Sequence, residues 1–282
     1  MAEHTTVPTY PLNDGNTLPA VGFGTYPLKG EDGIAAIQGA LEAGYRLLDT
    51  AVNYGNETEV GEALRRSGLA RDEVHVASKL PGRHHAYDDA IASVRGSLER
   101  LGLEYVDLHL IHWPNPSVDQ YVEAWRALVD LQKEGLVRSI GVSNFTEAHL
   151  TRIIDDSGMT PAVNQIELHP RFPQAGMRAV NERLGIRTEA WSPMGKRNAP
   201  LEEDPVTAAA ARLGATPGQV ILRWHVQLGS LPIPKSSNPE RQRQNLDLFG
   251  FELSDAEIEA ISALGRPDGR LFGGDPDTHE EM

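Results

Sequence analysis

LLDTAVNYGN, residues 47–56, is an apolar run that ends at an aspartate and passes into a polar turn carrying a tyrosine. By itself the stretch predicts only a strand that enters a turn. Its significance comes from repetition, because strand-like runs recur along the whole chain. There are eight of them: AVGFGTY (20–26), YRLLDTA (45–51), VHVASKL (74–80), VDLHLIHW (106–113), SIGVSNF (139–145), AVNQIEL (162–168), RTEAWSPM (187–194) and SLPIPKS (230–236).

Amphipathic helical segments separate these runs. In GIAAIQGALEAG the residues Ile34, Ile37 and Leu41 recur at helical spacing, and Gly44 is placed to end the helix. A later helix is expected to open at Pro217. Eight strand–helix units in succession indicate an α/β protein with a parallel sheet, and they match the closed (β/α)8 TIM barrel. An open, doubly wound sheet is the alternative.

The chain contains no shift in composition that would mark a linker, so residues 1–282 are expected to form a single barrel domain. Residues 1–17 carry an Asp-Gly pair between extended runs, which is a hairpin signal, and this β-hairpin is predicted to cap the bottom of the barrel. Residues 266–282 are rich in glycine, proline and acids. They are predicted to form a loop or a loose tail.

Composition excludes several classes of function. The 40 acidic and 26 basic residues give a net charge of −14, which argues against a nucleic acid or an anionic membrane as partner. There is no cysteine, hence no disulfide and no thiolate metal site, and no other metal-ligand cluster is evident. No signal peptide is recognisable, and no apolar run approaches the ~18 residues of a membrane helix. We therefore expect a cytoplasmic protein. No exposed apolar stripe demands a partner subunit, so a monomer is expected.

Polar residues gather where the predicted strands end, which in a barrel is the end that carries the chemistry. A single aspartate or serine there is often only a turn former or a helix cap. Convergence of many such residues on one rim favours a site. The residues concerned are Asp49, Lys79, His112, Ser143, Asn144, Gln165, Trp191, Ser192, Lys235 and Ser236.

Four of the candidates could together protonate a carbonyl oxygen. A tyrosine such as Tyr54 has an ordinary pKa of about 10, and a neighbouring ammonium such as Lys79 would lower it. A carboxylate, Asp49, could keep that lysine charged, and His112 could hydrogen-bond the substrate oxygen. A protonated carbonyl must also receive a hydride at carbon, for which a nicotinamide is the natural donor.

A dinucleotide would need an unusual site, because GFGTYPLKG (22–30) lacks the GxGxxG spacing. The segment IPKSSNPERQRQN (233–245) offers one. Lys235 and Arg241 can bind a phosphate, with Ser236 and the amides of the next helix start as further donors. Two cations favour a phosphorylated ribose, and hence NADPH/NADP+ with weaker use of NADH.

The sequence closely resembles the aldo-keto reductase family over essentially its whole length. The matching stretches are GFGTY, LLDTAVNYGNETEVGEAL, ASKL, YVDLHLIHWP, IGVSNF, NQIELHP, AWSPMG and PIPKSSNPERQRQN. Within the family it resembles prokaryotic members that reduce keto-sugar acids such as 2,5-diketo-D-gluconate.

The resemblance implies hydride transfer from nicotinamide C4 to a carbonyl carbon, with Tyr54 as the general acid and its pKa lowered by Lys79. Asp49 would hold Lys79, and His112 would orient the carbonyl. The implied cofactor residues are Gly24, Thr25, Asp49, Ser143, Asn144, Gln165, Trp191, Ser192, Pro193, Met194, Gly195, Ile233, Lys235, Ser236, Arg241, Gln244 and Asn245. The implied substrate residues are Tyr26, Asn53, Tyr54, His112 and Trp113.

Positions that differ from the commonest family pattern suggest the kind of substrate. Asn53 suggests a polar substrate, namely a small dicarbonyl, a keto acid or a keto-sugar acid. A short loop after His112 and a short C-terminal segment should leave the pocket open.

Three other histidines are not expected to belong to the site. His109 should face the helices, because its offset from His112 is odd, and the pair at 84–85 is expected to be exposed to solvent.

Two other functions are compatible with such a barrel. One is a nucleotide-sensing regulatory subunit that keeps the cofactor site but has marginal catalysis. The other is a phosphate-binding isomerase or aldolase, which would need a general-base glutamate or an uncharged lysine at a strand end. A lysine beside Asp49 should stay protonated and does not suit that role.

Overall fold

The structure, a computed structural model, describes residues 7–282. Its main sheet contains eight parallel strands that lie side by side in chain order. They are β3 (Phe23–Gly24), β4 (Leu47–Asp49), β5 (His75–Leu80), β6 (Val106–Ile111), β7 (Val137–Ser143), β8 (Val163–Glu167), β9 (Arg187–Trp191) and β10 (Leu231–Pro232). Each predicted strand-like run therefore overlaps one strand.

The ring closes between the first and last strands. Gly22 N donates to Pro232 O at 3.0 Å and Gly24 N donates to Pro234 O at 3.1 Å. A Cβ atom on Gly24 would lie 3.1 Å from the backbone oxygen of Ile233, so glycine permits this close approach. The predicted (β/α)8 barrel is confirmed, and the open-sheet alternative is wrong.

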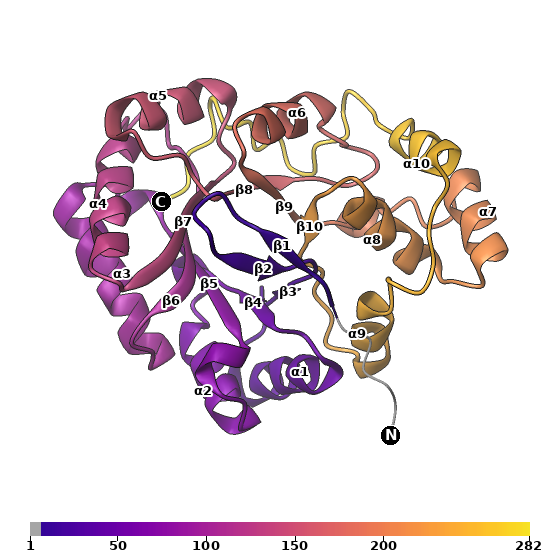
Figure 1. The fold of residues 1–282 in the computed structure, drawn as a ribbon, viewed down its shortest axis with the longest axis horizontal. Helices are drawn as coiled ribbons and strands as arrows, with labels where there is room; N and C mark the ends of the chain where they lie inside the picture. Colours follow the sequence, from indigo (N-terminus) through magenta and orange to yellow (C-terminus); the bar gives the residue numbers. More distant parts are fainter. Residues whose placement is uncertain (1–6) are drawn as a thin grey trace.

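Helices surround the strands on the outside of the ring (Figure 1). They are α1 (Gly30–Ala43), α2 (Glu57–Ser67), α3 (Tyr87–Leu101), α4 (Tyr121–Lys133), α5 (Glu147–Ser157), α6 (Ala175–Arg183), α7 (Asp204–Leu213), α8 (Pro217–Gln227), α9 (Pro239–Leu246) and α10 (Asp255–Ser262). Gly44 ends α1 in the left-handed region at φ 111°, and Pro217 opens α8 after a Thr216 cap, both as predicted.

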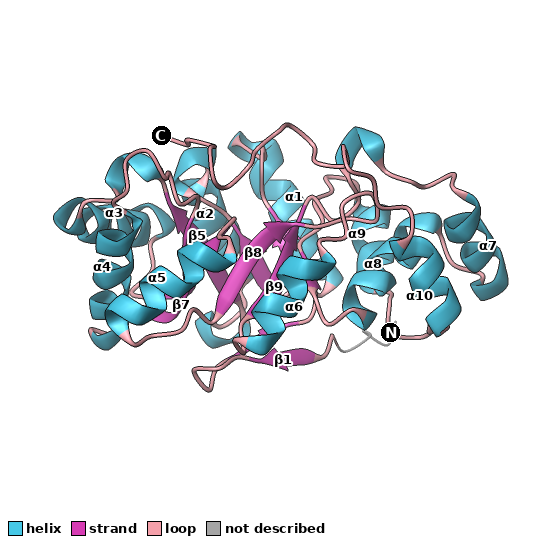
Figure 2. Cartoon of the chain, turned by 90° about the horizontal axis from the view of Figure 1, so that it is seen from above, coloured by secondary structure: helices cyan, strands magenta, loops and turns pink. Residues whose placement is uncertain are grey.

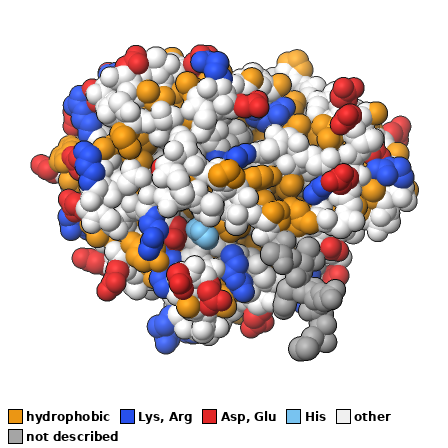
Figure 3. Space-filling model, viewed as in Figure 1, with side chains coloured by type: hydrophobic (Ala, Val, Ile, Leu, Met, Phe, Trp, Pro, Cys, Tyr) orange, Lys and Arg blue, Asp and Glu red, His pale blue; other side chains and the backbone are white. Residues whose placement is uncertain are grey.

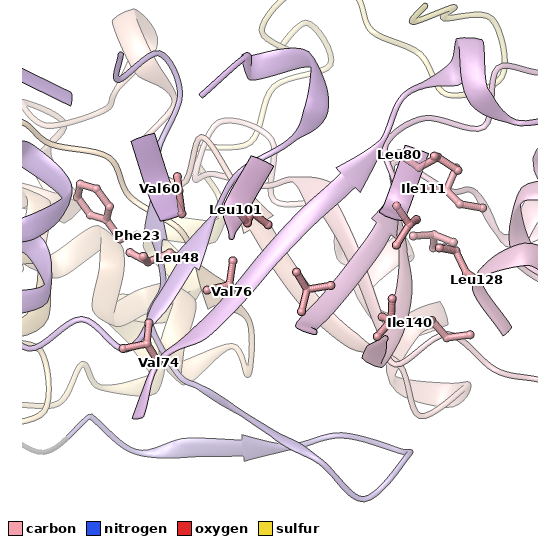
Figure 4. Packing of buried hydrophobic residues seen from close by; sticks show 14 of the residues in the cluster. Phe23, Leu48, Val60, Val74, Val76, Leu80, Leu101, Ile111, Leu128 and Ile140 are labelled. Atoms are coloured by element: carbon pink, nitrogen blue, oxygen red, sulfur yellow. The ribbon is translucent and has the colours of Figure 1, made fainter. Parts of the chain in front are cut away.

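Strand alternation separates two apolar layers. Leu48 and Val76 point outward and pack in the cluster that also contains Val60 and Leu101 of the helices (Figure 4). Their chain neighbours Leu47 and Ala77, with Leu108, Leu110, Val163 and Leu231, fill the interior of the barrel. The same alternation directs Asp49 and Lys79 inward, because each lies two residues after an interior side chain.

A two-stranded antiparallel hairpin covers one end of the barrel. It consists of β1 (Thr9–Pro11) and β2 (Thr17–Pro19), so the predicted boundary at residue 17 is two residues short, and residues 1–6 lie outside the described residues. Asn13 Nδ2 donates to Pro161 O at 2.9 Å, before β8, and Asn16 Nδ2 donates to Ser139 Oγ at 3.0 Å. Figure 2 shows β1 at the end opposite the C-terminus.

On the face that carries the hairpin, acidic and basic side chains are interspersed (Figure 3). In the part of the chain that the structure describes, no helix is long and apolar enough to cross a membrane. His109 is fully buried and lies on the helix-facing side of β6, as its alternation with Leu108 and Leu110 requires.

Candidate active site

Lys79 is the centre of a buried polar cluster at the carboxyl ends of β4 and β5. Its ammonium donates to both oxygens of Asp49, at 2.6 and 2.8 Å, and to Thr50 O at 2.9 Å. Burial is the largest single effect and would lower the pKa of Lys79, but the Asp49 carboxylate and other neighbouring groups together outweigh it, and the pKa lies above its ordinary value. Lys79 is therefore charged at neutral pH.

Tyr54 lies against this ammonium. It ends the short helical turn η1 (Val52–Tyr54), and its Oη is 3.4 Å from Lys79 Nζ. Its ring is 5.8 Å from the ring of His112. Tyr54 as a residue is half-buried, but its hydroxyl end is enclosed by protein.

The protonation behaviour of Tyr54 differs from the prediction. Burial of the hydroxyl group raises the pKa of Tyr54 to about 12, and the opposing charge of Lys79 offsets burial only in part. The predicted lowering of this pKa is therefore wrong for the protein alone. The lysine still acts in the predicted direction, but desolvation is the larger effect.

Three further side chains connect the strand ends to one another. Gln165 Nε2 donates to Asp49 Oδ2 at 2.8 Å, and Ser143 Oγ donates to Gln165 O at 2.8 Å. Asn144 adopts a left-handed conformation at φ 62°, which asparagine tolerates better than most residues. From there its Nδ2 donates to His112 O at 3.0 Å and its Oδ1 accepts from Trp191 Nε1 at 2.8 Å.

A cavity of about 690 Å³ opens above this cluster. Sixteen predicted site residues line it: Gly24, Thr25, Tyr26, Asp49, Tyr54, His112, Trp113, Ser143, Asn144, Gln165, Trp191, Ser192, Pro193, Met194, Ile233 and Lys235. Six further lining residues were not predicted from the sequence: Pro27, Lys196, Ala199, Leu201, Pro234 and Phe272. Phe272 had one signal, an aromatic residue within a Gly-rich tail.

The remaining predicted site residues lie outside the lining of this cavity. Gly195 is in the turn after β9, where its N–H donates to Ser192 O at 2.8 Å. Ser236, Arg241, Gln244 and Asn245 lie just before α9 or on it, beyond Lys235. The Lys235 and Arg241 side chains are exposed, whereas Asn245 is buried.

The C-terminal segment, residues 266–282, is a loop, as one of the two predicted alternatives has it, but it folds back onto the rim and is not a loose tail. Glu281 Oε1 lies 2.8 Å from His112 Nδ1 and accepts from Asn53 Nδ2 at 2.7 Å. The backbone of Glu281 is bound in addition by the Asn115 amide, through Asn115 Nδ2 to Glu281 O and Glu281 N to Asn115 Oδ1. Farther back, Leu271 N donates to Glu167 Oε1 at 2.8 Å.

The tail also covers part of the pocket. The ring of Phe272 lies 5.7 Å from that of Trp191 and 6.2 Å from that of Trp113. The expectation that a short tail leaves this side open is therefore wrong. Asn53 turns its amide to the tail and to Arg83 instead of lining the cavity. His85 is fully buried beneath the same region, which corrects the prediction of an exposed histidine pair.

A model of the Aldo/keto reductase family matches residues 20–266, which is most of the chain and includes every residue of the polar cluster. The chain belongs to the aldo/keto reductase family. Family membership makes it an oxidoreductase that acts on carbonyl groups.

Relatives within this family match the chain from end to end. The chain is 58% identical over 276 residues to 2,5-diketo-D-gluconic acid reductase B from Corynebacterium, covering 98% of this chain and 99% of the relative. An aldo/keto reductase structure from Brucella melitensis is 46% identical with a TM-score of 0.88, covering 92% of this chain and 100% of the other. A mutant of Gox0644 in complex with NADPH is 41% identical with a TM-score of 0.93, covering 98% and 100%.

The described residues are suited to a dinucleotide and offer little to a metal. No group of three or more histidine, aspartate or glutamate side chains within residues 7–282 could hold a metal ion. By contrast, a half-buried indole, Trp191, lines one part of the cavity and Lys235 another. An aromatic face at one end and exposed cations at the other match a ring and a phosphate of one ligand.

Proposed function

We propose that this aldo/keto reductase transfers a hydride from NADPH to an aldehyde or ketone, with Tyr54 as the general acid, and that it uses NADH less well. The observation that carries the proposal is the contact of one charged, buried lysine with both Asp49 and Tyr54. An isomerase or aldolase would need that lysine uncharged, or a free general base beside it. The Asp49 carboxylate keeps the lysine charged and so precludes an uncharged lysine.

The chemistry requires a hydride at carbon and a proton at oxygen. NADPH supplies the hydride when bound. Tyr54 donates its phenolic proton to the carbonyl oxygen as negative charge develops there, and Lys79 stabilises the resulting phenolate. An alkoxide is a much stronger base than a phenolate, so a phenol with a pKa of about 12 remains a competent donor. His112 lines the same cavity and orients the carbonyl by a hydrogen bond from its ring.

For the cofactor, we assign the nicotinamide to Ser143, Asn144 and Gln165, with Trp191 stacked on the ring. Gln165 donates one N–H to Asp49, and the rest of its amide would hold the carboxamide. The turn from Ser192 to Gly195 would follow the pyrophosphate, and Gly24, Thr25 and Ile233 would form the opposite wall.

The distal end of the cofactor is assigned to the start of α9. Lys235, Ser236 and Arg241 would bind the 2′-phosphate, and Gln244 and Asn245 would lie near adenine. Asn238 caps α9 by accepting from Arg241 N at 3.0 Å, which fixes the helix start that presents these side chains. Related structures in complex with NADPH or NADP support the choice of cofactor.

For the substrate, we propose a small polar dicarbonyl, a keto acid or a keto-sugar acid bound between Tyr26, Trp113 and the tetrad. Similarity to a reductase named for 2,5-diketo-D-gluconic acid supports the keto-sugar acid in particular. The aromatic walls of Tyr26, Trp113 and Phe272 suit the apolar face of a sugar-derived chain.

Steady-state oxidation of NADPH, followed by its absorbance, tests the proposal directly. The carbonyl panel should contain methylglyoxal, 2,5-diketo-D-gluconate, an aromatic aldehyde and a ketosteroid. We expect turnover with at least one polar member and a lower kcat/KM with NADH. Tight NADPH binding with no more than one turnover on the whole panel would instead indicate a nucleotide-sensing subunit. The cytoplasmic location, the monomeric state and the lack of a nucleic-acid partner remain predictions.

A further inference from the structure

A second carboxyl group lies inside the barrel beside the tetrad. Glu189 is on β9, where it is paired in register with Gln165 of β8 on one side and with Leu231 of β10 on the other. The residue is completely buried. Neither of its carboxyl oxygens receives a hydrogen bond of ordinary geometry from the described residues.

The surroundings of Glu189 decide its charge. The barrel interior that β9 faces is apolar, with Leu47, Leu110 and Val163 in its cluster. A carboxylate in such a place, without a hydrogen bond of ordinary geometry, is so costly that the group takes up a proton. The nearby Asp49 carboxylate acts in the same direction, as in other pairs of neighbouring acids that hold one proton between them.

Four strands present side chains towards Glu189. β4 presents Asp49 and β5 presents Lys79, with Tyr54 beyond it, whereas β8 presents the uncharged Gln165 and β10 the apolar Leu231. Gln165 directs an N–H at Asp49, and its amide also acts on Glu189 as a hydrogen-bond donor that favours the charged carboxylate, as does the positive charge of Lys79. Burial, and then Asp49, raise the pKa of Glu189 to about 8.

We propose that Glu189 is a positioning residue for proton transfer, whose uncharged form leaves Asp49 as the single carboxylate that faces Lys79. An ionised Glu189 would place a second negative charge beneath the tetrad, draw the ammonium away from Tyr54 and oppose formation of the phenolate. The proposal rests on the function assigned above. It assigns an electrostatic role to a residue of the barrel interior outside the tetrad.

Two measurements test it. The first is the pH profile of kcat for reduction, in wild type and in Glu189→Gln, with Glu57→Gln as the matched control. Glu57 is an equally buried acid, but it contacts Ser78 and Arg100 outside the cavity. Wild type and control should lose about tenfold in kcat one pH unit above the ionisation of Glu189, and Glu189→Gln should lose nothing over that range. Tyr54 does not titrate there.

The second measurement is infrared spectroscopy of the unliganded protein. A protonated carboxyl group has a C=O stretching band that carboxylates lack. This band should be present in wild type at neutral pH, disappear as the pH is raised, and be absent from Glu189→Gln. A band with the same titration in Glu189→Gln, or a pH profile unchanged by that substitution, overturns the proposal.

The infrared result separates the proposal from the function beneath it. If no carbonyl on the panel is reduced, the proposed function fails while the band still reports the charge of Glu189. If Glu189→Gln does not fold, the wild-type protein alone provides the test. The midpoint of the infrared titration is then compared with the midpoint of the kcat pH profile, and a mismatch between the two overturns the inference.

Discussion

Glu281 Oε1 lies 2.8 Å from His112 Nδ1, and this contact joins the end of the chain to a residue at the carboxyl end of β6. The same carboxylate oxygen accepts from Asn53, next to Tyr54 in the chain. One side chain of the tail thus connects the two loops that carry the histidine and the tyrosine of the tetrad. The first two predictions follow from this connection.

Replacement of Glu281 by glutamine should raise KM for the substrate about fivefold. The change removes the charge facing His112, and a partly exposed charged contact of this kind is worth about 1 kcal/mol. Steady-state kinetics on the best panel substrate measures the effect. Glu280→Gln removes an equal charge from the adjacent residue, which instead accepts from Ser117 N. Equal effects of both variants would mean that only the net charge of the tail matters.

Gly82→Ala should displace the tail without any change of charge. A Cβ atom at residue 82 would lie 2.1 Å from Glu281 O and 1.9 Å from Asn115 Nδ2, which is closer than atoms can approach. We expect a KM increase like that of Glu281→Gln, with altered fluorescence of Trp113, which packs on the tail. Gly176→Ala is the control, because nothing lies within 4 Å of its added Cβ atom. Unchanged kinetics in Gly82→Ala would show that the tail docks too weakly to matter.

Tyr54→Phe should reduce kcat by about 10²–10⁴-fold, the usual contribution of a general acid. NADPH affinity should not change, because the phenolic proton is transferred only during the reaction. Turnover and a fluorescence titration with NADPH measure the two quantities separately. Retained turnover would remove Tyr54 from its proposed role.

Arg241→Ala should weaken NADPH binding by about 1.5–3 kcal/mol, the value of one charge-assisted hydrogen bond, and should leave NADH binding nearly unchanged. Arg243→Ala is a control on the same helix, since Arg243 is equally exposed but pairs with Glu240. Calorimetric titration of both cofactors provides the comparison. A similar loss for NADPH and NADH would place the 2′-phosphate elsewhere.

Acid should destabilise the fold between about pH 6.5 and pH 4 through its buried histidines. Burial lowers the pKa of His85 to about 4 and those of His109 and His225 to about 3. The unfolded chain, with histidine pKa values near 6.5, therefore binds more protons than the native state as the pH falls, and stability is lost. Each ring contributes up to about 1.4 kcal/mol per pH unit.

Urea midpoints measured at several pH values in this range test the effect. His109→Gln removes one of the three rings and should reduce the slope of stability against pH. A midpoint that does not move with pH would mean that the native state accepts protons at these rings.

The sequence predicts most of this architecture, because strand alternation carries the information. Asp49 and Lys79 follow interior residues at a spacing of two, so their convergence can be deduced before any coordinates are known. The position of the tail could not be deduced in this way. It depends on contacts such as those of Glu281 with Asn53 and Asn115, which have no period and span most of the chain.

The raised pKa of Tyr54 could not be predicted from the sequence for a different reason. Sequence identifies the charge next to the phenol, but the cost of removing that phenol from water depends on how completely the loops enclose it. The burial of His85 is a failure of the same kind. Both are determined by enclosure, which side-chain identity alone does not specify.

The seam between β3 and β10 has a consequence for ligand binding. Both strands have only two residues, and the ring is joined there by backbone hydrogen bonds from two glycines, which contribute no side-chain packing of their own. Gly24 and Thr25 line the cavity on one side of the seam, and Ile233 and Lys235 line it on the other. A ligand that contacts both sides would connect β3 to β10 and bind only when the ring is closed. Ligand binding would therefore stabilise the ring against opening at this seam.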